Sequence, residues 1–118
     1  MIVELTESLM SDLFNRANYP RDSAERAVLL ELEDAVRELA YVRRHFAAKA
    51  GHVAAQLQEA VRLASTSGRE PNACGALQSV AELEVLNGRI YAGRKNVAGL
   101  VNAAKSIGIL NKSTVYEY

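Results

Sequence analysis

An acidic cluster is the part of the sequence that most resembles a catalytic site. Its members are Glu31, Glu33, Asp34 and Glu38. Carboxylates on one helix can hold Mg²⁺ for the hydrolysis of nucleotide pyrophosphates, but that chemistry needs a second acidic set that faces the first. Glu82 and Glu84 are the only candidates for the second set, and in a helical hairpin they come level with residues 55–57, which is out of reach. A solvated helix face is therefore favoured, and a Mg²⁺-dependent nucleotide pyrophosphohydrolase is the least favoured of three functions.

The histidines and the single cysteine indicate no further site. His45 and His52 are seven residues apart and point to similar sides of one helix, but no third ligand accompanies them, so structural or surface roles are favoured over zinc. Cys74 falls in the first turn of a predicted helix, where a small buried residue is favoured over a reactive thiol. No Ser/His/Asp order and no phosphate-binding glycine loop can be read. We expect no catalytic residue, no metal and no cofactor.

Composition and charge describe one small soluble domain. Of the 118 residues, 49% are hydrophobic and only 6% are aromatic, which predicts a core of aliphatic side chains between closely approaching helices. The 14 basic residues balance the 14 acidic ones, so no net field attracts nucleic acid or an anionic membrane. No apolar stretch approaches the roughly 20 residues of a membrane span. Glu4 and Glu7 stand where an export signal has basic residues, so we expect a cytoplasmic protein.

Two helix-stopping segments divide the chain into three predicted helices. A proline disfavours helix at residues 18–20, and a polar cluster with glycine and proline occupies residues 65–72. The intervening periodicity predicts helices over about 3–17, 23–66 and 72–107, the last with an asparagine cap. No strand is expected.

The second helix is expected to be one long rod. It begins at Asp22 or Ser23, either of which can cap it. Apolar residues then recur every three or four positions from Val28 to Ala64 and pass through Gly51 without a break.

The third helix carries a regular apolar stripe. Its members are Leu86, Ile90, Gly93, Val97, Leu100, Ala104 and Ile107. Because the stripe is unbroken, a continuous helix is favoured over a stop at Asn87-Gly88. Residues 109–118 lose the periodicity and are expected to form a flexible tail. The predicted fold class is all-α: a long antiparallel helical hairpin with a short N-terminal helix, bundle-like or coiled-coil-like, in a single domain over residues 1–118.

Charges on the two arms of this hairpin can be compared directly. Glu31 and Asp34 come level with residues 105–108, so the acidic cluster lies beside a stretch without acids. Arg43, Arg44 and His45 come level with Arg94 and Lys95, so like charges meet there. Either these side chains point outward in different directions, or they form a site for an acidic partner segment.

Small residues on the third helix point to binding rather than catalysis. They are Gly88, Gly93, Ala98, Gly99, Ala103 and Gly108. Set among aliphatic side chains, they would form shallow notches that another helix can enter. Two alternatives stay open: either the protein's own first helix or a twin subunit fills the notches, or they capture a partner's amphipathic helix.

The C-terminal third resembles flagellar export chaperones of the FlgN type. The resemblance covers about residues 80–118. It rests on the run from Glu82 to Ile90 with Asn87-Gly88 inside it, on the basic residues and apolar stripe that follow, and on a polar spacer before Val115-Tyr116. It implies an all-α cytosolic chaperone that binds the C-terminal helices of hook-filament junction subunits and delivers them to the export gate.

On this resemblance, the stripe would cover a client helix whose apolar face is otherwise exposed, and basic residues would select acidic flanks. The predicted partner-binding residues are Leu86, Ile90, Gly93, Arg94, Lys95, Val97, Leu100, Val101, Ala104 and Ile107. Tyr116 would contact the export gate; the competing interpretation is that Tyr116 and Tyr118 pack on the bundle or stay free. The alternative function is a structural coiled-coil or adaptor protein that forms a homo-oligomer through the 86–107 stripe.

Overall fold

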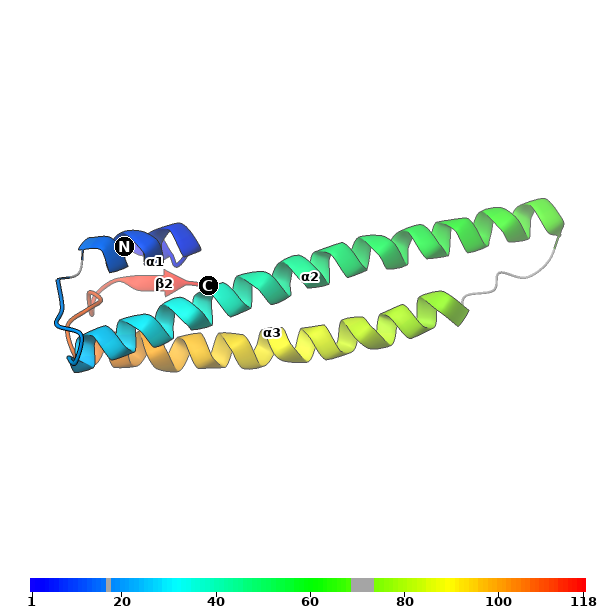
Figure 1. Ribbon diagram of the computed structural model, residues 1–118. Helices are drawn as coiled ribbons and strands as arrows, with labels where there is room; N and C mark the ends of the chain where they lie inside the picture. Colours follow the sequence, from blue (N-terminus) through cyan, green and yellow to red (C-terminus); the bar gives the residue numbers. More distant parts are fainter. Residues whose placement is uncertain (17, 69–73) are drawn as a thin grey trace. The chain divides into compact units, whose positions relative to one another are not determined.

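The computed structural model describes residues 1–16, 18–68 and 74–118 (Figure 1). Within these ranges the helices are α1 (Glu7–Arg16), α2 (Ala24–Ser67) and α3 (Cys74–Ser106). Two short strands, β1 (Ile2–Glu4) and β2 (Val115–Glu117), pair in parallel. The prediction of an all-α hairpin of two long helices with a short N-terminal helix is confirmed.

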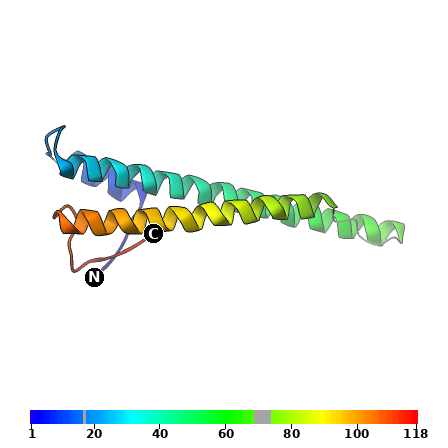
Figure 2. The same cartoon turned by 90° about the horizontal axis from the view of Figure 1, so that it is seen from below.

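Contacts group the chain into two compact units. Unit 1 consists of Met1–Tyr41 and Tyr91–Tyr118, and unit 2 consists of Val42–Ile90. In unit 1, the first part of α2 runs antiparallel to the last part of α3, and both views show the two segments side by side (Figure 2). In unit 2, the second part of α2 packs antiparallel to the first part of α3. The single domain over residues 1–118 stays a prediction.

The start of α2 is fixed by Ser23 rather than Asp22. The backbone N–H of Arg26 donates to Ser23 Oγ at 3.2 Å, and the Ser23 hydroxyl in turn donates to the Pro20 carbonyl at 2.7 Å. A side-chain oxygen that accepts from an N–H of the first turn is the mark of an N-cap. From there α2 passes through Gly51 without interruption, which confirms the continuous second helix.

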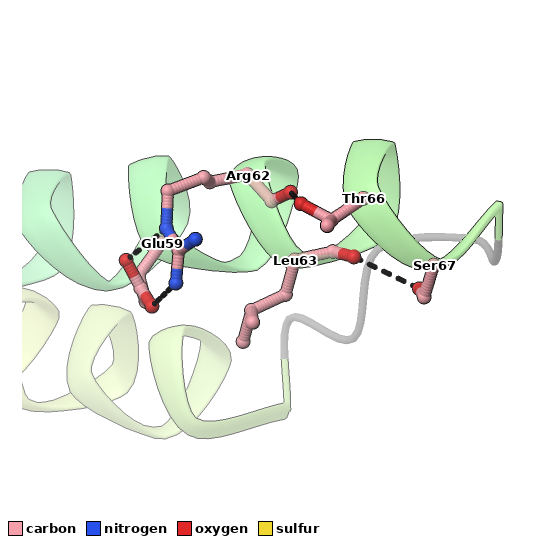
Figure 3. A network of polar contacts seen from close by, with 5 residues as sticks. All are labelled: Glu59, Arg62, Leu63, Thr66 and Ser67. Atoms are coloured by element: carbon pink, nitrogen blue, oxygen red, sulfur yellow. Dashed lines mark hydrogen bonds and ion pairs between the residues drawn. The ribbon is translucent and has the colours of Figure 1, made fainter.

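Hydroxyl side chains and a glycine close the far end of α2 (Figure 3). Thr66 Oγ1 donates to the Arg62 carbonyl at 2.7 Å, and Ser67 Oγ donates to the Leu63 carbonyl at 2.8 Å. Gly68 follows with φ of 69°, a conformation that costs glycine little, and its N–H donates to the Ala64 carbonyl at 2.9 Å. The Gly68 bond gives a partner to Ala64, one of the last four carbonyls of α2, which the helix itself leaves without one. The hydroxyls of Thr66 and Ser67 add a second bond to carbonyls one turn back.

The third helix is also continuous through Asn87-Gly88, as predicted. It ends in a Schellman motif: Ile109 N–H donates to the Ala104 carbonyl at 2.9 Å, and Gly108 N–H donates to the Lys105 carbonyl at 3.3 Å. Gly108 has φ of 84°, which the motif requires. The predicted cap at Asn72 lies outside the described residues.

The predicted first helix over 3–17 is wrong in its opening turn. Val3 belongs to β1, and α1 begins at Glu7. Thr6 caps α1, because its Oγ1 accepts from the Leu9 N–H at 3.1 Å. The few apolar residues before Thr6 fit either a strand or a helix, and the backbone pairing with β2 decides between them. Residue 17 lies outside the described residues.

The segment 109–118 also differs from the predicted flexible tail, because it contains β2. Leu5 N–H donates to the Glu117 carbonyl at 2.7 Å, and Val115 N–H donates to the Met1 carbonyl at 2.9 Å. Leu110 is buried as well. The partner of this strand is at the other end of the sequence, so no local sequence pattern predicts the pairing.

The larger core is in unit 1. Its buried apolar residues are Leu5, Met10, Leu29, Leu32, Ala35, Val36, Leu39, Val97, Val101, Ala104 and Leu110. Unit 2 is a helix pair that buries far less, and its buried apolar residues are Val42, Val53, Ala76 and Leu86. Unit 1 therefore buries more apolar side chains than unit 2, although it also leaves some exposed, among them Ile2, Leu30 and Ile107.

Candidate functional site

The predicted apolar stripe of α3 is largely inside the chain's own core. Val97 and Ala104 are 0% exposed, and Leu86 is buried, as is Val101, a predicted partner-binding residue next to the stripe. In this conformation those four side chains offer no surface to a partner. The accessible members are Ile90 and Leu100, which are half-buried, and Ile107, which is 39% exposed.

The notch predicted at Gly93 is filled by α2 of the same chain. A Cβ at Gly93 would lie 3.3 Å from Leu39 Cδ1, so the absence of a side chain lets the two helices of unit 1 approach closely. A Cβ at Gly88 or Gly99 would meet no atom within 4 Å. On one of the two alternatives, the first helix or a twin subunit was predicted to fill the notches. In the structure, Leu39 of α2 occupies the notch at Gly93.

The predicted basic partner-binding residues face groups of their own unit. Lys95 Nζ lies 4.5 Å from the centre of the Tyr91 ring. Arg94 lines a hollow of about 430 Å³ together with Tyr116, Glu117 and Tyr118. Both cations therefore have aromatic or acidic neighbours within unit 1, while their selection of acidic client flanks stays a prediction.

Tyr116, the predicted contact for the export gate, is half-buried in β2. The Lys105 ammonium lies 5.6 Å from the centre of its ring, within cation–π range. This arrangement agrees with the competing interpretation that Tyr116 packs on the bundle. The gate contact stays a prediction.

The register of the hairpin differs from the predicted one by about two helical turns. Glu82 forms an ion pair with Lys49, although the prediction places Glu82 near residue 57. A Cβ at Gly75, almost at the start of α3, would lie 3.6 Å from Gln56 Nε2, so α2 extends about three turns past the start of α3. The predicted meeting of Arg43 and Arg44 with Arg94 and Lys95 depended on the earlier register and does not follow from this one.

The acidic cluster divides into an ion pair and the wall of a hollow. Glu33 pairs with Arg37 one turn away at 2.6 Å. The other three carboxylates line a hollow of about 360 Å³ between α2 and α3 in unit 1, here called the acidic hollow. Its lining residues are Glu31, Asp34, Ala35, Glu38, Asn96 and Leu100. Among the described residues no three His, Cys, Asp or Glu side chains are grouped so that they could hold a metal ion.

Unit 2 leaves a set of aliphatic side chains exposed, here called the uncovered side chains. They are Leu57, Val61 and Leu63 on α2, and Leu77, Val80 and Val85 on α3. Leu77 and Val85 are each 66% exposed. Leu57 belongs to the regular apolar spacing from Val28 to Ala64 and was therefore expected to face the core, whereas the other five residues were not predicted to be exposed. Their positions off the regular stripe were the available signal, since an aliphatic residue outside the buried face of a helix pair has nothing to cover it.

The exposed pair of Glu59 and Arg62 shows the clearest electrostatic effect in the described chain (Figure 3). Arg62 donates to both carboxylate oxygens of Glu59, at 2.6 and 3.0 Å. The hydrogen bond from Arg62 lowers the pKa of Glu59 below its ordinary value, and the same bond raises the pKa of Arg62. Because both side chains are in water, this is a surface ion pair and not a catalytic arrangement.

Comparison of the chain with protein-family models, with curated proteins and with solved structures gave no match. In the described part of the chain, none of the helices combines the length and the apolar character that crossing a membrane requires. The surfaces of the two units therefore provide the available indications of function.

Proposed function

We propose that this protein is a non-enzymatic chaperone that captures an amphipathic helix of an exported protein subunit. The observation that carries the proposal is the set of uncovered side chains in unit 2. The finer identification, with hook-filament junction subunits as clients and an export gate as the destination, rests on the resemblance of residues 80–118 to FlgN-type chaperones. On this proposal the chaperone acts in the cytoplasm.

The physical reason for a helical client is the shape of unit 2. A pair of helices can bury only the sides that face each other, and here the two helices bury few apolar residues. A third helix laid along the pair would cover apolar side chains on both sides of the new contact. Each half-exposed aliphatic side chain that leaves water contributes about 1 kcal/mol, from which the entropy of association must be subtracted.

Leu57 and Val61 are the most useful members of this surface for a test. They are four residues apart and therefore neighbours on one face of α2. Both are exposed, so substitution there removes contact area for a partner with limited damage to the core. Self-association through the 86–107 stripe is less favoured, because its central side chains are already buried in one chain.

The test is a titration of the protein into a fluorescent peptide that carries the C-terminal helix of a hook-filament junction subunit. We expect the double variant Leu57→Asp and Val61→Asp to bind at least about tenfold more weakly than the wild type, because two charges replace apolar contacts. The matched control is Gln58→Asp with Ser65→Asp, which adds the same charge at exposed polar positions of the same helix. Far-UV circular dichroism checks that all variants remain helical.

Two results would contradict the proposal. One is the absence of saturable binding by the wild type. The other is equal binding by the wild type and the Leu57→Asp and Val61→Asp variant. Sedimentation in parallel identifies self-association: a wild-type oligomer that this variant dissociates would assign the uncovered side chains to a second copy of the chain.

A further inference from the structure

The ion pair between Lys49 and Glu82 distinguishes the two sides of unit 2. Lys49 stands four residues before the buried Val53, and Glu82 stands four residues before the buried Leu86. Four residues turn a helix by about 40° more than one full turn, so positions four before and four after a buried residue lie to opposite sides of it. Because Lys49 meets Glu82, these two residues mark a side that α2 and α3 share, here called the bridged side.

Three of the uncovered side chains lie on the opposite side of the helix pair, here called the open side. Leu57 stands four residues after Val53, and Val61 follows after four more. Val80 stands four residues after the buried Ala76 of α3. By the same rotation, all three exposed side chains are turned away from the bridged side.

The two rows of α2 residues that border these sides differ in chemistry. On the open side, residues recur in steps of four and three: Arg43, Ala47, Ala50, Ala54, Leu57 and Val61. On the bridged side, the same steps give His45, Lys49, His52, Gln56, Glu59 and Leu63. The open row is apolar after its first residue, whereas the bridged row is polar until its last. A second apolar row in steps of four and three, beside the one that faces α3, is the pattern of a helix that packs against two helical neighbours.

The length of the open row indicates the length of its occupant. From Ala47 to Val61 the row extends over about 21 Å, which is the length of two heptads. The approach of Gly75 to Gln56 puts Val80 level with about residue 51 of α2, beside the middle of this row. The alanines leave room for another helix to approach closely, and the larger side chains supply apolar contact area.

Charges of opposite sign lie on the open side of the two helices. Arg43 begins the open row of α2, and Glu84 stands four residues after Val80 on α3. Both are exposed, and neither forms an ion pair with any residue that the structure describes. A helix with acidic residues on the flank beside α2 and basic residues on the flank beside α3 would complement both charges.

We propose that the client helix docks on the open side of unit 2, as a third helix of about two heptads with one acidic and one basic flank. Leu57, Val61 and Val80 contact its apolar stripe, Arg43 faces its acidic flank, and Glu84 faces its basic flank. This inference rests on the proposed capture of a client helix, and it adds the side, the length and the charge pattern that a client must match.

The test compares two pairs of alanine substitutions on α2. Ala47→Glu with Ala54→Glu, the open-row variant, places two carboxylates on the open side. Ala48→Glu with Ala55→Glu is the matched control, because these alanines are exposed and have the same spacing but belong to neither row. The probe is a designed fluorescent helical peptide with a leucine stripe two heptads long, glutamate on one flank and lysine on the other. Fluorescence anisotropy measures its binding, and far-UV circular dichroism checks that the variants remain helical.

We expect the control to bind this peptide like the wild type, and the open-row variant to bind it at least about tenfold more weakly, because the leucine stripe would desolvate the new carboxylates. Equal binding by the two variants would overturn the proposal, as would a wild type that does not bind the peptide. So would a wild-type oligomer that the open-row variant dissociates, because the occupant would then be a second copy. A wild type that binds this peptide on the open side but does not bind the junction-subunit helix would contradict only the client identity proposed above.

A second measurement changes the charge at Arg43 and leaves the apolar part of the row intact. Its additional probe is the same designed peptide with lysine on both flanks. The wild type should bind the peptide with mixed flanks at least about threefold more tightly, because a lysine beside Arg43 is repelled. Arg43→Glu should remove or reverse this preference. An unchanged preference in that variant would overturn the assigned acidic flank, and this result does not depend on the folding of the open-row variant.

Discussion

At the scale of single residues, Gly93 shows how one missing side chain sets the approach of two helices. Leu39 is buried and its Cδ1 lies 3.3 Å from where a Cβ would stand at Gly93. Gly93 could be predicted from the sequence as a notch, but the residue that fills it could not, because that depends on the register between the helices. Leu100 and Ile107 illustrate the same difficulty, since both belong to the apolar stripe but remain partly accessible.

The contact at Gly93 predicts opposite behaviour for two alanine substitutions in α3. Gly99→Ala should raise the free energy of unfolding by about 0.5–1 kcal/mol, because alanine favours the helix and nothing lies within 4 Å of the new Cβ. Gly93→Ala should gain less or lose stability, because the buried Leu39 side chain must move. Urea unfolding of both variants measures the difference. An equal gain at both positions would contradict the close approach.

The pair of Glu59 and Arg62 predicts a small pH-dependent effect. The pKa of Glu59 is lowered, so its contribution to stability is present above the ordinary pKa of a glutamate and is lost as the pH falls through the lowered value. Glu59→Gln should therefore be slightly less stable than the wild type at neutral pH and equal to it in acid. Thermal unfolding of both proteins at the two pH values measures this. A stability difference that increases on acidification would show that the sign is wrong.

At the scale of elements, the long helices could be predicted from the sequence because their signals are local. A regular apolar spacing outweighed Gly51 in α2 and Asn87-Gly88 in α3, and both helices are continuous. The strands and the hairpin register could not be predicted in the same way. Pairing of β1 with β2 joins the two ends of the sequence, and the register depends on where α3 begins after residues 69–73, which the structure does not describe.

The cap of α2 provides a prediction at this scale. Ser23→Ala should lower the free energy of unfolding by about 1 kcal/mol, because the N–H of Arg26 loses its acceptor. Asp22→Ala should change stability less, since the structure assigns the cap to Ser23. Chemical denaturation of the two variants separates these sequence candidates. A larger loss for Asp22→Ala would place the helix start one residue earlier.

The strand pairing makes a prediction for amide hydrogen exchange. The N–H groups of Leu5 and Val115 donate to backbone carbonyls across the two strands, so both should exchange more slowly than that of Lys112 in the exposed turn before β2. Residue-resolved exchange by NMR gives all three rates. If the amides of Val115 and Lys112 both exchange as fast as in an unstructured peptide, the strand pairing would be contradicted. Residues 109–118 would then form the flexible tail that the sequence predicts.

At the scale of the whole molecule, the difference between the units is their burial of apolar side chains. Unit 1 combines α1, the strands and parts of both long helices around a core, whereas unit 2 has only a helix pair and exposes Leu57, Val61, Leu77 and Val85. The proposed capture of a client helix gives these exposed side chains a role.

The most direct test of the proposed capture is amide hydrogen exchange of the wild type, alone and with a saturating client helix. In the free protein, amides of α2 in unit 2 should open with less free energy than those around Leu32 and Leu39 in unit 1, because fewer contacts hold them. Addition of the client helix should slow exchange within residues 42–67 and 74–90 by about tenfold or more. Exchange in these segments that does not change when the client helix is added would contradict the account.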